Sequence, residues 1–190
     1  TLALLIASEE ITSSLFGYGS FDDLSVKNSA NALFYFALGL PAFSFIKIFS
    51  SFLFARHNTK VPFYFSVISV IINIIISIYY FNKIGFIIIP MATTISSWLN
   101  AILLLIFLTN KKYYSINSIF LYSLIKISLS TAITSYIFYN LINFFSDNLS
   151  YNSEYKLVSI ILLVIVTIII YILTSILTKA FKISDIKLKY

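Results

Sequence analysis

Long apolar segments separated by short polar connectors set the pattern of this chain. Each segment reaches or nearly reaches the roughly 20 residues that a helix needs to cross about 30 Å of hydrocarbon. Backbone groups inside a membrane must be hydrogen-bonded within the protein, and the segments do not alternate as membrane strands would, so we expect helices. The pattern predicts membrane helices at residues 30–54, 62–81, 86–109, 118–145 and 156–178. Residues 1–16 are interpreted as the end of a further membrane helix, and 17–29 as a turn on the outer face.

The composition supports a membrane protein and excludes several kinds of site. Hydrophobic residues make up 59% of the 190 residues and charged residues only 11%, whereas soluble domains carry roughly 25% charged residues. The mean hydropathy is +0.96. Cysteine is absent and His57 is the one histidine, which excludes disulfides, thiolate metal sites and histidine-rich metal clusters. The predicted fold class is therefore an all-α, polytopic membrane protein built as a helical bundle. Because the chain starts at Thr1 inside an apolar run, we expect it to be a piece of a longer protein, with the remaining N-terminal helices as its partners.

The charges in the connectors predict an orientation. The connectors on one side, with the C-terminal tail 179–190, hold eight cations: Arg56, Lys60, Lys111, Lys112, Lys179, Lys182, Lys187 and Lys189. The other side holds Lys27, Lys83 and Lys156 together with four acids, Asp22, Asp23, Asp147 and Glu154. Because positive connectors stay in the cytoplasm, we expect the first set and the C-terminus to be cytoplasmic. The basic tail could also contact anionic lipid.

Lys47 is the most costly residue of the predicted spans. It lies nine residues before Arg56, which is about 14 Å along a helix axis and therefore near mid-membrane. A lysine at the centre of a membrane helix costs about 2.5–3.5 kcal/mol. Ser44, Lys47 and Ser51 fall on one helical face. Gly39 and Pro41, just before them, are expected to loosen or kink the helix.

Polar residues also recur at helical spacing in the other spans. They are Ser66, Ser69, Asn73 and Ser77; Thr93, Ser96, Ser97 and Asn100; Ser123, Lys126, Ser130 and Thr134; and Thr167, Tyr171, Thr174 and Ser175. One interpretation is helix packing, in which small hydroxyl residues let helices approach and hydrogen-bond. The other is a shared hydrated cavity, which Lys47 favours because a dry interface would leave its ammonium unpaired. Lys126 is about 12 Å from the cytoplasmic end of its span, so it could instead reach the membrane surface.

The acids of the chain argue against several function classes. All seven acidic residues lie in or near connectors. A proton relay would need a carboxylate within the spans, and a membrane glycosyltransferase would need acids to hold its metal and diphosphate. We therefore expect no enzyme. Ammonium and hydroxyl groups suit an anion such as a phosphate or diphosphate head group.

One cation site remains open on the sequence. Asn73 and Ser77 are one helical turn apart, and Thr93 of the next span could face them. Their three oxygens could form a weak Na⁺ site, and the alternative is an ordinary hydrogen bond between helices. No other metal or cofactor and no nucleic acid is expected, and membrane lipids are expected partners.

Two stretches of the chain carry a family resemblance. The string LFGYGSF, followed by ALFYFALGLPAFSFIKIFSSFLFARHNTKVP and then KIGFIIIPMATTISSWLNAILLL, resembles lipid II flippases of the MurJ (MviN) type. The matching residues are Leu40, Pro41, Ala42, Phe43, Lys47, Phe54, Ala55, Arg56, Thr59, Lys60, Pro62, Asn73, Gly85, Thr93, Trp98 and Asn100. The likeness runs from residue 15 to about 110, whereas the last two spans match only in length, place and hydropathy. The chain departs from the family at Tyr18, where a basic residue is usual, and at His57-Asn58, where an acidic residue is usual.

The resemblance implies a member of the multidrug/oligosaccharidyl-lipid/polysaccharide exporter superfamily. Such proteins have two helix lobes around a cavity that opens alternately to each side, and this chain would be the C-terminal part. The cavity would take the diphosphate-sugar-peptide head of lipid II, and a groove made with the final two helices would take its polyprenyl tail. The location implied is the bacterial inner membrane, with residues 17–29 in the periplasm.

The leading hypothesis is therefore lipid II flipping by alternating access, without bond chemistry. Lys47, Ser44, Ser51 and Lys126 are the candidate head-group residues, and Arg56 and Lys60 form the cytoplasmic rim. One alternative is a related exporter of another polyprenyl-linked polysaccharide or a drug. The other is a non-transporting membrane scaffold, in which the polar stripes would meet in dry contact and Lys47 would pair with a carboxylate.

Overall fold

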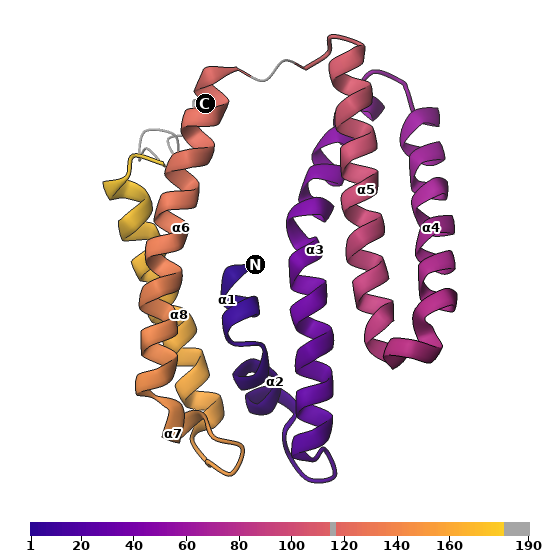
Figure 1. The fold of residues 1–190 in the computed structure, drawn as a ribbon. Coiled ribbons are helices and arrows are strands. Elements are labelled where there is room, and N and C mark those ends of the chain that lie inside the picture. The colour runs from indigo at the N-terminus through magenta and orange to yellow at the C-terminus, as the bar shows by residue number, and fades with distance from the viewer. Residues whose placement is uncertain (115–116, 181–190) are drawn as a thin grey trace. The chain divides into compact units, whose positions relative to one another are not determined.

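Helices make up nearly all of the structure. The computed structural model describes residues 1–114 and 117–180, and this part of the chain contains no strand. The elements are α1 (Leu2–Ile6), α2 (Ser8–Phe16), α3 (Asp23–Ala55), α4 (Lys60–Ile84), the short 3₁₀ helix η1 (Gly85–Ile87), α5 (Ile88–Asn110), α6 (Ser118–Phe144), α7 (Ser146–Leu149) and α8 (Lys156–Leu177) (Figure 1). The all-α class predicted from the sequence is confirmed.

The described residues form two compact units. Unit 1 contains residues 28–114, and unit 2 contains residues 2–27 and 117–180. Unit 1 therefore holds most of α3 with α4 and α5. Unit 2 holds α1, α2, the first turn of α3, and α6 to α8.

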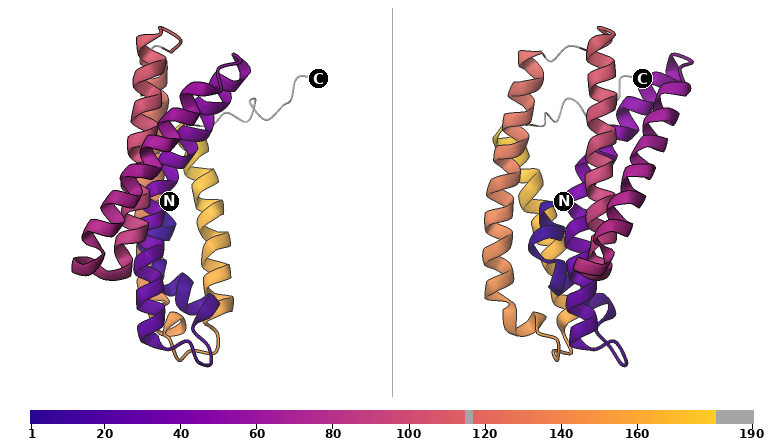
Figure 2. Two further views of the ribbon diagram at one scale, coloured as in Figure 1. Left: turned by 90° about the vertical axis from the view of Figure 1, so that its right-hand side faces the viewer. Right: turned by 45° about the vertical axis from the view of Figure 1, so that its right-hand side comes forward.

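In unit 1, α4 and α5 form an antiparallel hairpin. The two helices lie side by side in all three ribbon views (Figures 1 and 2). The chain reverses at Gly85, whose φ of +78° and ψ of −157° are almost restricted to glycine. The α3 helix packs on this hairpin through a core of leucines and aromatic residues, namely Leu53, Leu104 and Leu108 with Ile46, Phe49, Val61, Phe65, Phe107 and Tyr114.

Two hydrogen bonds and a glycine bring α3 close to α5. Thr94 Oγ1 donates to the carbonyl of Tyr35 at 2.6 Å, and Trp98 Nε1 donates to the carbonyl of Leu38 at 3.1 Å. A Cβ on Gly39 would lie 3.0 Å from Thr94 Oγ1, so the missing side chain permits this approach. Pro41 lies inside α3, which is helical from Asp23 to Ala55 without a break. A kink at Gly39 and Pro41 therefore stays a prediction, and the observed role of Gly39 is close packing.

In unit 2, α6 and α8 pack together, and α1, α2 and α7 cover one part of them. The shared core consists of Ala7, Phe138, Ile142, Leu149, Ile160 and Leu163. It joins residues from the two ends of the sequence, because Ala7 comes from the break between α1 and α2 whereas the others belong to α6, α7 and α8.

The apolar helices are long enough to make this a multi-pass membrane protein. By length and composition, the candidate spans are Asp23–Ala55, Lys60–Asn110, Phe120–Phe144 and Lys156–Leu177. The second stretch has 51 residues and contains both α4 and α5, which turn back on each other at Gly85. Each helix of that hairpin exceeds the roughly 20 residues needed to cross a membrane, because α4 has 25 residues and α5 has 23.

The boundaries differ from the sequence prediction at two places near the N-terminus. Residues 23–29, expected in a turn, belong to α3, because Asp22 accepts a hydrogen bond from the Ser25 backbone N–H at 2.9 Å and caps the helix there. Residues 1–16, expected as one helix end, are divided at Ala7, whose φ of −115° and ψ of 29° are not helical. Most of the predicted basic tail, at 181–190, lies outside the described residues.

Candidate functional site

The polar face of α3 is open in the structure. Ser44, Lys47 and Ser51 are all exposed. At about 100° per residue, they lie roughly 120° to 180° around the helix from Leu53, which is buried against α5. The predicted polar face therefore points away from the packed side of α3.

Lys47 has no partner in the part of the chain that the structure describes. Its ammonium makes no hydrogen bond and no ion pair with residues 1–114 or 117–180. The one ion pair among these residues joins Lys27 to Asp23 at 2.6 Å. Ser44, one helical turn before Lys47, donates its hydroxyl to the Leu40 carbonyl of the same helix at 3.1 Å. A cation without a nearby acid is what the cavity interpretation requires.

The polar faces of α4 and α5 meet each other instead. Asn73 Nδ2 donates to Thr93 Oγ1 at 3.1 Å and to Ser96 Oγ at 3.3 Å. Asn100 Nδ2 donates to Ser66 Oγ at 3.5 Å, the outer limit of a hydrogen bond. Ser96 and Asn100 are both buried. For these two helices the packing interpretation holds, and the polar residues serve to join them.

The polar faces of α6 and α8 also meet. Thr134 Oγ1 and Thr174 Oγ1 are hydrogen-bonded at 3.1 Å, and Ser130, Thr134 and Ser175 are buried. Lys126, on the same side of α6, is half-buried and forms neither a hydrogen bond nor an ion pair with described residues. Lys126 belongs to unit 2, whereas Lys47 belongs to unit 1.

In the predicted cation site, Asn73 and Thr93 are hydrogen-bonded to each other and Ser77 has no hydrogen-bond partner among the described residues. Asn73 and Thr93 are hydrogen-bonded, as the packing alternative expects. Ser77 Oγ is buried and has no hydrogen-bond partner within the described residues. Asparagine, serine and threonine supply only neutral oxygens, and no cluster of three His, Cys, Asp or Glu side chains occurs in the described chain. The residues present therefore form at most an incomplete Na⁺ site that lacks a carboxylate.

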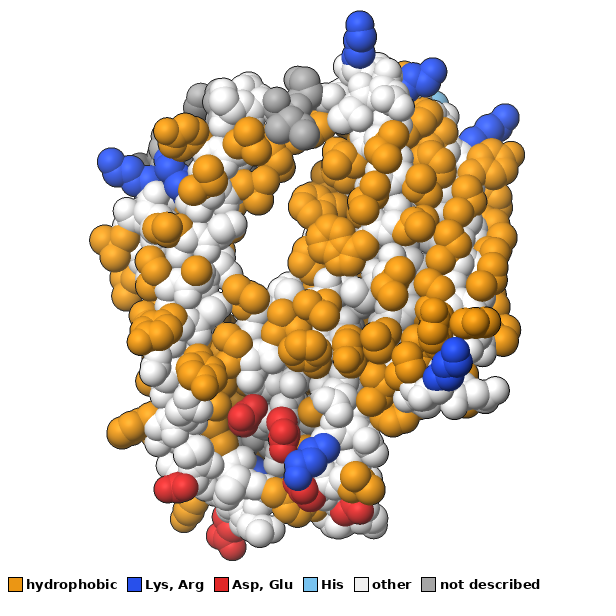
Figure 3. Space-filling view, viewed as in Figure 1, with side chains coloured by type: hydrophobic (Ala, Val, Ile, Leu, Met, Phe, Trp, Pro, Cys, Tyr) orange, Lys and Arg blue, Asp and Glu red, His pale blue; other side chains and the backbone are white. Residues whose placement is uncertain are grey.

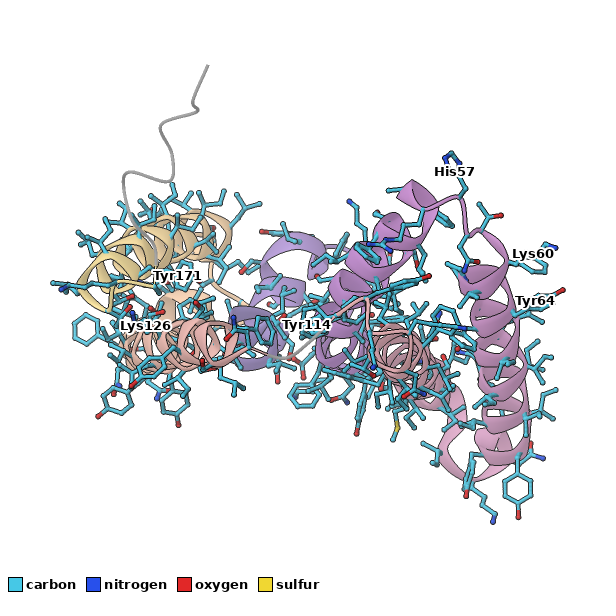
Figure 4. The ribbon with its side chains drawn as sticks, turned by 90° about the horizontal axis from the view of Figure 1, so that it is seen from above. His57, Lys60, Tyr64, Tyr114, Lys126 and Tyr171 are labelled. Carbon is cyan, nitrogen blue, oxygen red and sulfur yellow. The ribbon has the colours of Figure 1, made fainter. Side chains whose placement is uncertain are left out.

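Arg56 and Lys60 have different surroundings at the predicted cytoplasmic rim. The Arg56 guanidinium carbon lies 4.7 Å from the centre of the Phe52 ring and 4.4 Å from that of Tyr113, so it joins the ends of α3 and α5 by cation–π contact. Lys60 begins α4 and is exposed. Figure 4 shows Lys60 and Tyr64 projecting from the same side of α4, with His57 projecting from the connector before it.

An open hollow of about 780 Å³ adjoins Lys60 in unit 1. Its wall combines serine and threonine hydroxyls with aromatic rings, from Ser50, Phe54, Thr59, Lys60, Pro62, Phe63, Tyr64 and Ser66. His57, where the chain departs from the family pattern, has a positive φ of 56° and lies in the turn that ends α3. This departure falls outside the wall of the hollow.

The sequence did not reveal the role of Lys156, the first residue of α8. Its side chain is buried at 2% exposure, although the charge pattern suggested a surface position. Lys156 Nζ donates to the carbonyl oxygens of Gly17 at 2.6 Å and Tyr151 at 2.8 Å. The rings of Tyr18 and Tyr151 lie 4.2 Å and 4.7 Å from the same ammonium. No local sequence signal announces this arrangement, because Gly17 and Lys156 are 139 positions apart.

Charged side chains gather at the ends of the helices. Acidic side chains are concentrated near α2, the start of α3 and α7, whereas Lys and Arg side chains lie at several separate helix ends and also among these acids, where Lys27 pairs with Asp23 (Figure 3). In unit 1, Arg56, Lys60, Lys111 and Lys112 lie where α3 and α5 end and α4 begins, and Lys83 lies at the α4–α5 turn.

Comparison with known proteins gives a consistent family. The family model described as "Lipid II flippase MurJ" matches residues 1–160. This range extends beyond the resemblance at residues 15–110 and includes α6 and the beginning of α8.

Curated relatives carry the same description. A probable lipid II flippase MurJ of Rickettsia prowazekii is 30% identical over 86% of this chain and 32% of its own length. The corresponding protein of Thermotoga maritima is 32% identical over 78% of this chain and 30% of its own length. That of Rhizobium meliloti is 38% identical over 54% of this chain and 19% of its own length. The matched region thus spans about a fifth to a third of these relatives.

The family model matches well over half of the chain, and the long apolar helices of the chain agree with that match. The chain belongs to the MurJ family of lipid II flippases.

Proposed function

We propose that this chain is the C-terminal part of a protein that flips lipid II across the bacterial inner membrane by alternating access. The match of residues 1–160 to the MurJ family carries the proposal. The relatives described as probable lipid II flippases are three to five times longer than the matched region, so the proposed activity belongs to the whole protein.

The open face of α3 is the proposed contact for the lipid head group. Lys47 contributes positive potential, and Ser44 and Ser51 lie beside it on the same face. A diphosphate interacts favourably with such a cation in a hydrated cavity, where the ammonium keeps its water until the anion arrives. The reaction is translocation, so these side chains bind and release the head group and no covalent bond is made or broken.

Three further cations are proposed to act in the same function. Lys126 of unit 2 adds positive potential along the path of the head group. Lys60 attracts the head group at the cytoplasmic rim, where its exposed position supports this role. Arg56 holds the ends of α3 and α5 together, and its contacts with Phe52 and Tyr113 support this structural role.

The orientation is part of the proposal. The C-terminus and the connectors with Arg56, Lys60, Lys111 and Lys112 lie in the cytoplasm, and residues 17–22 lie in the periplasm. The membrane potential could then bias the cycle, because moving one charge across 100 mV changes its free energy by about 2.3 kcal/mol. A weak Na⁺ site at Asn73, Ser77 and Thr93 is a further proposal, and the hydrogen bond between Asn73 and Thr93 favours the alternative of a simple contact between helices.

The scaffold alternative receives mixed support. It requires polar faces in dry contact, and α4–α5 and α6–α8 have them. It also requires Lys47 to pair with a carboxylate, and no such pair exists among the described residues. The family match favours lipid II transport over this alternative and over export of another substrate.

The test replaces Lys47 by alanine and by glutamate in the full-length protein and measures lipid II exposure on the outer face. One unit charge about 10 Å from a phosphate changes the interaction by about 1.7 kcal/mol at an effective dielectric constant of 20, so Lys47→Ala should reduce exposure roughly tenfold. Lys47→Glu should reduce it further, because the carboxylate repels the diphosphate. Lys83→Ala and Lys83→Glu, at the exposed α4–α5 turn, are matched controls and should retain activity. Equal activity of both Lys47 variants and the wild type would remove Lys47 from the mechanism.

A further inference from the structure

Lys156 occupies a position at which a cation needs a specific reason. It is the first residue of α8, and the positive end of a helix dipole disfavours a lysine there. It is also almost completely buried, and burial of an ammonium costs free energy unless polar groups replace its water. The described residues place no carboxylate against it, so the compensation must come from other groups.

Carbonyl oxygens and aromatic rings provide that compensation. The ammonium donates to the carbonyls of Gly17 and Tyr151, and the faces of Tyr18 and Tyr151 lie against it. Both kinds of group stabilise a cation without neutralising it. The result is a cage formed by the turn after α2 on one side and the turn before α8 on the other.

Hydrogen bonds around the cage hold the same two turns together. Ser14 Oγ donates to the Lys156 carbonyl at 3.2 Å, and Tyr18 Oη donates to the Ser14 carbonyl at 2.9 Å. Tyr151 Oη donates to the Phe21 carbonyl at 2.9 Å, just before Asp22 caps α3. We call this set of contacts around the ammonium the Lys156 clamp.

Gly17 shows how closely the turns approach. A Cβ on Gly17 would lie 3.1 Å from a ring carbon of Tyr151 and 2.6 Å from the Ser13 carbonyl oxygen. The second distance is shorter than real Cβ contacts allow, so any other residue would displace the backbone whose carbonyl binds Lys156. The clamp therefore depends on a glycine and a lysine that are far apart in the sequence and belong to the same unit.

We propose that Lys156 is a positioning residue that fixes the first turn of α8 to the α2–α3 turn, so that α8 and its partner α6 stay attached to this turn through the transport cycle. This inference rests on the proposed function for its effect on lipid II, but not for the clamp itself. The head group does not touch Lys156, which acts through the helices that it holds.

The test uses Ser14, which is fully buried in the clamp, as a reporter, and every rate is compared with that of the Ser14→Cys protein because the thiol replaces the hydroxyl that donates to the Lys156 carbonyl. In a cysteine-free full-length protein with Ser14→Cys, purified in detergent, the rate of maleimide labelling measures how often the clamp opens. Lys156→Met keeps the apolar stem and removes the charge, and it should increase this rate roughly tenfold or more. Lys27→Met is the matched control, because Lys27 is an exposed lysine in a surface ion pair, and it should leave the rate unchanged.

If Lys156→Met does not fold, two milder variants can still test the clamp. Tyr18→Leu removes one ring of the cage, and Tyr151→Phe removes only the hydrogen bond to Phe21; both should increase labelling by a smaller factor. Unchanged labelling in all these variants would overturn the clamp.

Transport of lipid II is measured separately on the same variants. Lys156→Met should reduce the turnover several-fold while the lipid II concentration for half-maximal rate stays the same, because the binding residues are intact. Faster labelling with unchanged turnover would overturn the role in the cycle. A wild-type protein that does not flip lipid II would contradict the proposed function, whereas the labelling result would still decide whether the clamp exists.

Discussion

Four cations that the sequence or the structure singled out have different surroundings. Lys47 is exposed and unpaired within the described chain, Lys126 is half-buried, and Arg56 lies between two aromatic rings. Lys156 is enclosed by carbonyls and rings. Lys156, which the charge pattern placed in a connector, is thus buried at the start of α8, whereas Lys47 is exposed and makes no hydrogen bond or ion pair with the described residues.

At the residue scale, Asp22 predicts a pH dependence of stability. Hydrogen bonds from the Ser25 hydroxyl and backbone N–H hold the pKa of the Asp22 carboxyl below its ordinary value of 3.8. A carboxylate with a lowered pKa stabilises the folded state above its unfolded-state pKa, and the contribution is lost as the pH falls through the lower, folded-state value. The melting temperature of the purified protein in detergent should therefore fall in part through Asp22 below about pH 3.8.

Variants separate the charge of Asp22 from its capping role. Asp22→Asn keeps a side-chain oxygen that can cap α3, so it should keep most of the stability at neutral pH and lose this part of the pH dependence. Asp22→Ala should lower the melting temperature at neutral pH, while Asp147→Asn should do neither. A pH profile of Asp22→Asn that coincides with that of the wild type would contradict the assignment.

At the scale of elements, the polar faces sort the helices into pairs. The faces of α4 and α5 meet through Asn73, and those of α6 and α8 meet through Thr134 and Thr174. The polar face of α3 faces no helix of its own unit, because α3 uses its other side to pack on α5. The same sequence pattern therefore produces two helix contacts and one open face.

The α4–α5 hairpin predicts a strong requirement for glycine at position 85. Its backbone conformation is almost restricted to glycine and costs another residue about 1–3 kcal/mol. Gly19, at a φ of +59°, has a left-handed conformation that asparagine tolerates. We expect Gly85→Asn to lower the melting temperature clearly, and Gly19→Asn to change it little.

Space does not complicate this comparison, because a Cβ at either glycine would meet no atom within 4 Å. Differential scanning fluorimetry in detergent is sufficient to measure both variants. Equal melting temperatures would mean that the turn at Gly85 relaxes to another conformation.

For the whole molecule, the proposed orientation predicts which connectors face each side. Single cysteines are introduced into a cysteine-free version of the full-length protein, and this chain has no cysteine of its own to replace. Cysteines at His57 and Lys112 should be protected from a membrane-impermeant maleimide in intact cells, after the outer membrane is permeabilised. Cysteines at Gly19, Lys83 and Asn152 should be labelled.

Lysis of the inner membrane provides the control, because all five positions should then react. Labelling of His57 and Gly19 from the same side would contradict the antiparallel arrangement of the spans. Labelling of the cysteines at positions 57 and 112 alone would show that the chain has the opposite orientation in the membrane, with the same membrane helices.

The sequence by itself determined that this is a helical membrane protein, roughly where each long helix runs, and which family it resembles. The length of an apolar segment and the charge of a connector are local properties of the sequence, so they can be determined without knowing the tertiary contacts. Even so, the start of α3 at Asp23 and the break at Ala7 were missed, because caps and packing moved both boundaries.

Only the tertiary structure showed which polar faces pair and that Lys156 is buried. It also showed that the missing side chain of Gly39 lets Thr94 approach α3 closely. Serines and lysines at helical spacing look alike whether they face a neighbour, water or lipid, and the choice depends on which helices pack together. The contact between Lys156 and Gly17 joins residues 139 positions apart, and its stability comes from groups that meet only after the chain has folded.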